Sequence, residues 1–150
     1  MRRAFTMIEL VFVIVIIAIL AVLAIPRLSA TRDDAIASKL ASNIMVGAGE
    51  ISAYAMSHSN VSSDLTVMSN ALKSLQDMGD AVFSNYKATV KAGNIDNCVV
   101  VSIDTNNSTG IDTLNVSFND DNGDSLCKSL QSAIDPAQYP MKLRGGNVIY

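Results

Sequence analysis

The chain begins with MRRAFTMIELVFVIVIIAILAVLAIPR, residues 1–27, and this stretch decides how the rest is organised. Residues 10–25 are apolar without interruption, and residues 5–25 as a helix span about 32 Å, the thickness of a bilayer's hydrocarbon core. Two arginines precede the run and, by the positive-inside rule, hold the short amino end in the cytoplasm. We therefore expect a membrane-spanning helix that delivers the residues after Pro26 to the far side.

Two simple interpretations of such a segment are a removable signal peptide and a plain single-pass anchor. Glu9 argues against both, because it places a carboxylate inside the apolar span, where a charge is costly. Neither a signal peptide nor an anchor has a use for that charge. A carboxylate there needs a cationic partner in the same membrane layer.

The order Ala4-Phe5-Thr6-Met7-Ile8-Glu9-Leu10, followed by the apolar run and Pro26, resembles the class III signal of type IV pilins and type II secretion pseudopilins. The resemblance implies that a prepilin peptidase cuts after Ala4, where the family usually has Gly, and that Phe5 becomes the N-methylated terminus. It also implies that Glu9 acts in assembly. Pro26 falls at the end of the span, where it removes one backbone donor and favours a kink in the helix.

Assembly has a physical explanation in these terms. Cleavage removes both leading arginines and leaves an ammonium on Phe5, at the positive end of the helix dipole. In a filament, that amine can neutralise Glu9 of a neighbouring subunit inside an apolar interior. The partners implied are further copies of the chain, other pilin-like subunits, the prepilin peptidase, an inner-membrane assembly platform and membrane lipid.

The resemblance implies an α+β fold with a long amino-terminal helix packed on a small antiparallel sheet. We expect a leader at 1–4, a transmembrane or filament-core helix at 5–26, an amphipathic continuation at 27–57 and a globular head at 58–150. The continuation has apolar or small residues at helical spacing, namely Leu28, Ile36, Leu40, Ile44, Gly47, Ile51 and Ala55. Gly47 and Gly49 mark either close packing or a weak point of that helix.

Within the head, the pattern predicts five further elements. They are a helix over 65–82, strands at 98–103 and 113–118 that form an antiparallel hairpin, a short helix over 126–134 and a last strand at 148–150.

Cys98 and Cys127 are the two cysteines of the chain, 29 residues apart. As free thiols they would be ordinary buried small residues. On the oxidising side of a membrane, a disulfide that clamps the short helix to the sheet is favoured. A loop of that size would stabilise the fold by roughly 3–4 kcal/mol in the chain-entropy model.

An acidic loop, residues 119–124, lies between the second strand and the short helix. Asp120, Asn122 and Asp124 have the alternating spacing of calcium ligands, but the Gly is two positions early for an EF-hand and no Glu lies at the twelfth position. The resemblance adds weight to calcium, because major pseudopilins often bind it in a carboxy-terminal loop. An Asn-Gly turn with Asp124 as a helix cap explains the same residues, and both interpretations stay open.

Composition limits the function. Acids number 14 and bases 11, for a formal net charge of −3, so a broad basic surface for direct nucleic-acid binding is excluded. His58 is the single histidine, predicted to be a solvated loop residue, and no nucleophile set, phosphate loop or HExxH motif accompanies it. We therefore expect no enzymatic activity and no cofactor apart from the calcium alternative.

The sequence thus favours a structural subunit of a pilin-like periplasmic filament, anchored in a bacterial inner membrane with a periplasmic head. A type II secretion pseudopilin is the leading hypothesis. A type IV pilus or DNA-uptake pilin is the close alternative, and a single-pass anchored binding domain that never polymerises is the alternative of another class.

Overall fold

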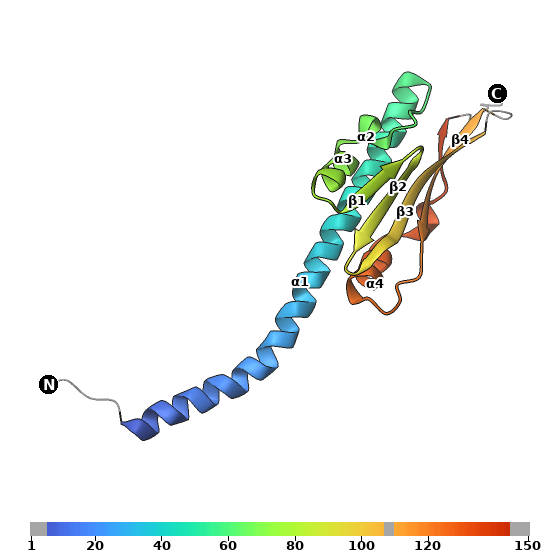
Figure 1. Cartoon of the computed structure of the whole chain (residues 1–150). Coiled ribbons are helices and arrows are strands. Elements are labelled where there is room, and N and C mark those ends of the chain that lie inside the picture. Colours follow the sequence, from blue (N-terminus) through green and yellow to red (C-terminus); the bar gives the residue numbers. More distant parts are fainter. Residues whose placement is uncertain (1–5, 107–109, 145–150) are drawn as a thin grey trace. The chain divides into compact units, whose positions relative to one another are not determined.

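The computed structural model describes residues 6–106 and 110–144, without the side chains of residues 25–30. The chain divides into two compact units, Met1–Asp33 and Asp34–Tyr150, and each is described by itself. Helix α1, Met7–His58, contributes its first part to the first unit and its second part to the second (Figure 1).

The second unit is an α+β structure built on one five-stranded antiparallel sheet. The strands follow one another in the order β1-β2-β3-β4-β5, so each pairs with its neighbours in the sequence. Their bounds are β1 Ala81–Ser84, β2 Lys87–Ala92, β3 Ile95–Asn106, β4 Ile111–Phe118 and β5 Met141–Arg144. Short helices α2 Leu65–Met68 and α3 Asn70–Asp77 precede the sheet, and α4 Ser125–Ser132 and the 3-10 turn η1 Pro136–Gln138 connect β4 to β5. The expected fold class is confirmed.

One face of α1 is buried in the core of the second unit. Its buried residues recur at steps of three and four: Ala37, Leu40, Ala41, Ile44, Ala48, Ile51 and Ala55. They share one hydrophobic cluster with sheet residues that include Val90, Val101 and Leu114. The predicted stripe is confirmed from Leu40 onward but wrong at Ile36, which is exposed, because the buried face begins one residue later at Ala37.

The single helix predicted over 65–82 is wrong, because the chain forms two short helices there and then enters β1 with Val82. The break is at Ser69, whose backbone is extended. Its hydroxyl oxygen accepts a hydrogen bond from the Leu72 N–H at 3.0 Å and so caps α3. Gly79, with φ +80°, lies between α3 and β1 in a conformation that continues neither element.

Glu50 fixes this segment to α1. Its carboxylate accepts hydrogen bonds from the Ser69 hydroxyl at 2.7 Å and from the Ala71 N–H at 3.0 Å. These bonds, the Ala71 N–H first, lower the pKa of Glu50 below its usual value. The carboxylate of α1 therefore completes the cap of α3.

The predicted hairpin is confirmed, since β3 and β4 pair antiparallel with Val101 opposite Val116. The short helix predicted over 126–134 corresponds to α4, Ser125–Ser132, which begins one residue and ends two residues earlier than predicted. Strands β1, β2 and β5 were not predicted, although Lys87–Ala92 does alternate between exposed and buried side chains. The strand predicted at 148–150 lies outside the described residues.

The two glycines of α1 should respond differently to alanine. A Cβ on Gly47 would come within 2.6 Å of Leu72 Cγ, and Leu72 is fully buried, whereas a Cβ on Gly49 would meet no atom within 4 Å. Both substitutions gain the same helix propensity, about 1 kcal/mol. Overpacking should therefore leave Gly47→Ala less stable than Gly49→Ala by about 1–3 kcal/mol in chemical denaturation followed by circular dichroism. Equal stability of the two variants would show that α3 shifts to accommodate the added methyl group without destabilising the head.

Candidate functional site

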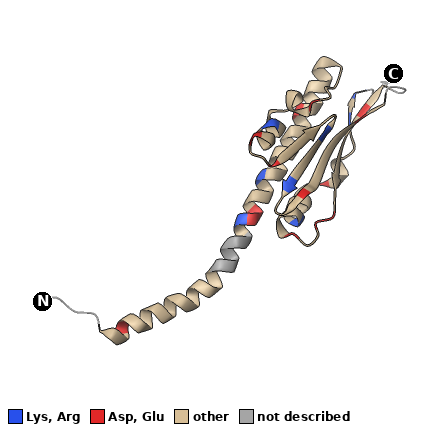
Figure 2. Ribbon diagram, viewed as in Figure 1, with Lys and Arg blue, Asp and Glu red and all other residues tan. Residues whose placement is uncertain are grey.

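The first unit presents an apolar helix that its own chain leaves uncovered. Met7–Ala24 is long and apolar enough to cross a membrane, with a mean hydropathy of 3.2, and none of it is buried. Residues such as Phe12, Ile19 and Val22 are more than half exposed. Figure 2 shows this part of α1 without charge apart from one acidic position, which in the sequence is Glu9. A surface of this kind needs lipid or other protein to cover it.

Glu9 lies in the first turn of α1 and its side chain is exposed. The Glu9 N–H donates to the Thr6 hydroxyl oxygen at 3.4 Å, and the Thr6 hydroxyl donates to Glu9 Oε2 at 3.4 Å. This Thr-x-x-Glu arrangement resembles a capping box, a role for Thr6 that the sequence analysis missed although the spacing is a known signal. Both bonds are long, so a cation from another molecule can still reach the carboxylate.

The other predicted site residues of the amino-terminal segment cannot be placed. Ala4 and Phe5, predicted for cleavage and methylation, lie outside the described residues, as does the side chain of Pro26, predicted to kink the helix. Their roles stay predictions.

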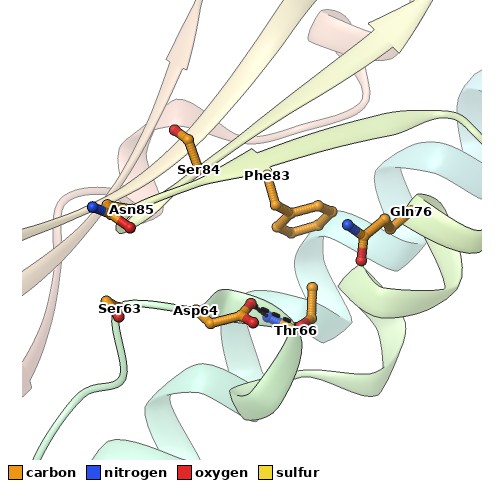
Figure 3. A pocket seen from close by; sticks show the side chains of 7 residues that line it. All are labelled: Ser63, Asp64, Thr66, Gln76, Phe83, Ser84 and Asn85. Carbon is orange, nitrogen blue, oxygen red and sulfur yellow. Dashed lines mark hydrogen bonds between the residues drawn. The ribbon is translucent and has the colours of Figure 1, made fainter.

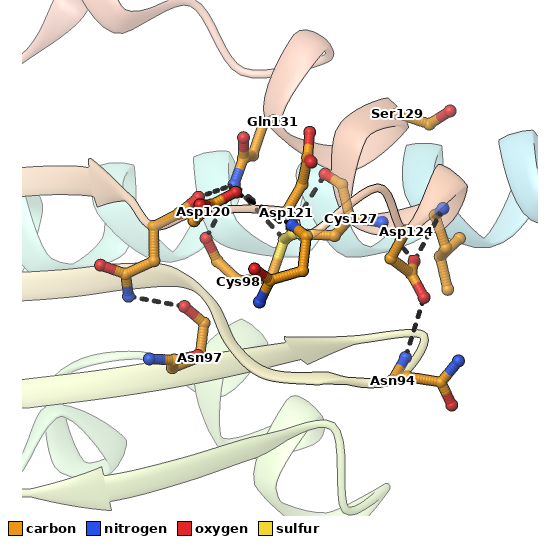
Figure 4. Close-up of a disulfide and its surroundings, with 12 residues drawn as sticks. Asn94, Asn97, Cys98, Asp120, Asp121, Asp124, Cys127, Ser129 and Gln131 are labelled. Atoms are coloured by element: carbon orange, nitrogen blue, oxygen red, sulfur yellow. Dashed lines mark hydrogen bonds between the residues drawn. A yellow bond between two sulfur atoms is a disulfide. The ribbon is translucent and has the colours of Figure 1, made fainter.

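A second cluster surrounds the disulfide that joins Cys98 of β3 to Cys127 of α4 (Figure 4). Both cysteines are fully buried. Beside them, the Gln131 amide donates to the carbonyl oxygens of Cys98, at 3.1 Å, and Asn119, at 2.7 Å. The Asn119 amide in turn donates to the Asn97 carbonyl oxygen at 2.6 Å. The cluster therefore ties α4 to the adjoining ends of β3 and β4.

The acidic loop behaves as a turn and a helix cap. Asp124 Oδ1 accepts from the N–H groups of Leu126 and Cys127, both at 3.0 Å, and its Oδ2 accepts from the Asn94 N–H at 3.1 Å. These bonds, with Asn94 first and Cys127 next, lower the pKa of Asp124. Asp120 accepts from the Asn122 N–H at 3.0 Å, which is an Asx turn.

Of the two readings of this loop, the turn and cap therefore account for the positions of Asp120, Asn122 and Asp124. Across residues 6–106 and 110–144, no three His, Cys, Asp or Glu side chains are grouped to hold a metal.

The sequence predicts that His58 lies in a loop, which is wrong, because His58 is the last residue of α1. Its ring stacks on Tyr54 with centroids 4.0 Å apart, and its Nδ1 lies 2.8 Å from the Ser57 hydroxyl. The side chain is exposed, as expected.

Both cysteines should resist alkylation until the protein is reduced and unfolded. Because each is fully buried and oxidised, iodoacetamide without reductant should label neither, and reductant plus denaturant should expose both. Intact mass spectrometry of protein purified from membranes gives the count of labels. Labelling of both cysteines without reductant would refute the disulfide.

Comparison with known families assigns the amino-terminal segment. Residues 1–25 match the family described as the prokaryotic N-terminal methylation motif. No curated protein and no solved structure matches the chain.

The structure is that of a protein with an α+β head and an amino-terminal helix that is long and apolar enough to cross a membrane. The matched motif is more specific: it is the class III prepilin signal of type IV pilin-like proteins, as the sequence predicts. The fold is consistent with a pilin-like fold. The motif belongs to a structural and not an enzymatic family, and it implies processing by a prepilin peptidase and assembly with other pilin subunits.

Proposed function

We propose that this chain is the structural subunit of a pilin-like filament that works in type II secretion. It is stored in the inner membrane with its amino end in the cytoplasm, is cut between Ala4 and Phe5, and polymerises on the periplasmic side. The leader then comprises residues 1–4, the filament core 5–26, the amphipathic helix 27–57 and the head 58–150.

The observation that carries the proposal is the position of Glu9 within the prepilin motif. An 18-residue apolar helix with no covering from its own chain has one carboxylate, one turn from the predicted mature terminus. In a plain anchor that charge would make membrane insertion less favourable and would serve no purpose. In a filament the same carboxylate pairs with the amine of a neighbour, and the apolar surface packs against other subunits.

Within the class, the small acidic head favours secretion over DNA uptake. The chain has 14 acidic and 11 basic residues, and cleavage after Ala4 removes two of the bases, leaving nine. An acidic filament has no electrostatic attraction for a phosphate backbone. A type IV pilus or DNA-uptake pilin is the alternative within the class.

Deleting the gene distinguishes a role in type II secretion from a role in a type IV pilus or in DNA uptake. If the chain is a secretion pseudopilin, the deletion strain should accumulate in its periplasm proteins that the parent releases into the medium. Surface pili and natural transformation should be unchanged. Loss of pili or of transformation with normal secretion would reject the secretion role and favour the alternative.

The mature amino terminus should be an N-methylated Phe5. Small side chains before the cut suit a peptidase that reads this position, and Ala4 is the smallest side chain after Gly. Intact mass of the protein from membranes should equal that of residues 5–150 plus one CH2, because a methyl group replaces an amine hydrogen, minus the two hydrogens of the disulfide. A mass that retains Met1, or one that begins near Ala24, would refute this processing.

A further inference from the structure

A small pocket lies in the head between the α2–α3 segment and the edge strand β1 (Figure 3). Its volume is about 280 Å³, close to the ~300 Å³ lower end of small-molecule pockets. It is lined by Ser63, Asp64, Thr66, Gln76, Phe83, Ser84 and Asn85. None of these residues takes part in the filament function proposed above.

The lining combines one aromatic ring with the side-chain amides of Gln76 and Asn85. Phe83 is half-buried: it packs against the core and also lines the pocket, where it points toward Thr66 and Gln76 (Figure 3). Among the described residues, the side-chain amides of Gln76 and Asn85 make no hydrogen bond. Each amide offers both donors and an acceptor.

Asp64 supplies the one charge of the pocket. Its Oδ1 accepts from the Thr66 hydroxyl at 2.7 Å and from the Thr66 N–H at 2.9 Å. These bonds, the hydroxyl first, hold the pKa of Asp64 below its usual value. Within the described part of the chain its Oδ2 has no partner, so that oxygen is available to a donor from a ligand.

We propose that this pocket binds one ring of an uncharged saccharide. The apolar face of a pyranose packs on an aromatic ring, and its hydroxyls, which both donate and accept, suit the amides of Gln76 and Asn85 and the free oxygen of Asp64. The volume admits a single ring.

The charge of the pocket argues against other ligands. A phosphate or carboxylate would be repelled by the ionised Asp64, and no lysine or arginine lines the pocket to offset it. A cationic ligand would gain one carboxylate but would leave the acceptors and donors of the amides poorly matched, because an ammonium or guanidinium only donates.

The test is ligand-observed saturation-transfer NMR on the full chain in a zwitterionic phosphocholine detergent, because sugar-headed detergents would compete. The probes are the methyl glycosides of glucose, galactose, mannose, N-acetylglucosamine and N-acetylgalactosamine, with arginine and inorganic phosphate as charged comparisons. The variants are Phe83→Leu and Gln76→Ala. Gln138→Ala is the matched control, because Gln138 is exposed on η1, outside the pocket lining.

At least one glycoside should give a signal, weakened about tenfold in affinity by Phe83→Leu and about fivefold by Gln76→Ala, and unchanged by Gln138→Ala. Gln76 is exposed, so its loss leaves the fold intact even if Phe83→Leu unfolds the head, which circular dichroism would reveal. Signals from none of the glycosides, signals from arginine or phosphate alone, or signals that Gln76→Ala does not weaken would each overturn the proposal.

Discussion

Replacing Glu9 with leucine should leave a processed, folded subunit that no longer forms filaments. The substitution makes the span more apolar, so membrane insertion should be unchanged or improved, and cleavage should survive because Phe5 is kept. Assembly would place the neighbour's ammonium in the filament interior without a counter-charge. Removing one partner of a buried pair costs about 3–5 kcal/mol, so filament yield should fall on the order of a hundredfold or more.

The measurement is filament yield from cells that overproduce the protein, alongside its membrane level and the mass of its amino-terminal peptide. Glu9→Asp should show a partial defect, because the shorter side chain keeps the charge but reaches less far. Normal filaments from processed Glu9→Leu protein would refute the pairing mechanism.

Thr6→Ala separates pairing from helix capping. Glu9 exchanges two hydrogen bonds with Thr6, and a purely local role would lie in those bonds. Thr6→Ala removes them but keeps the carboxylate, so under the pairing mechanism filaments should form at near-normal yield. A Thr6→Ala defect equal to that of Glu9→Leu would instead assign Glu9 to the cap.

The sequence predicted those features that consecutive residues carry. The amino-terminal motif could be recognised from the sequence because a charge such as that of Glu9 is rare inside an apolar run. The β3–β4 hairpin was predicted because an apolar β-branched run at 98–103 and an alternating segment at 113–118 flank a polar turn. The two cysteines left one pairing to consider.

Features that depend on distant residues could not be predicted. Ser69 separates α2 from α3 partly because Glu50, 19 residues earlier in the chain, accepts a hydrogen bond from the Ser69 hydroxyl. The acidic loop was ambiguous because its residues fit both a calcium-binding loop and a turn with a helix cap. Asp124 also accepts a hydrogen bond from the N–H of Asn94, which is 30 residues away in the sequence and is brought near only by the fold.

One ion pair of the head joins a buried carboxylate to a guanidinium whose side chain is 35% exposed. Asp112 of β4 is paired with the guanidinium of Arg144 on β5, and the side chain of Asp112 is only 1% exposed. The same guanidinium donates to the Ser59 carbonyl oxygen at 3.0 Å, just after the end of α1. Arg144 therefore joins the last described strand both to β4 and to the end of the long helix.

Arg144→Ala should destabilise the head by about 3–5 kcal/mol, because it leaves the Asp112 carboxylate buried without a counter-charge. The loss should be severe here, since in the described part of the chain Asp112 Oδ1 already has no hydrogen-bond partner. Denaturant unfolding of the full chain in detergent, followed by circular dichroism because the chain has no tryptophan, measures the change.

Lys91→Ala is the matched control, because Lys91 pairs with Asp96 at 3.0 Å with both side chains at least half exposed. Breaking that surface pair should cost under about 1 kcal/mol. The double variant Asp112→Leu with Arg144→Met should recover most of the loss, because an apolar pair removes the buried charge along with its partner. An Arg144→Ala loss no larger than that of Lys91→Ala would mean that the Asp112 carboxylate is solvated or satisfied by another group. An unrecovered double variant would mean that Arg144 acts mainly through its bond to Ser59, which methionine cannot make.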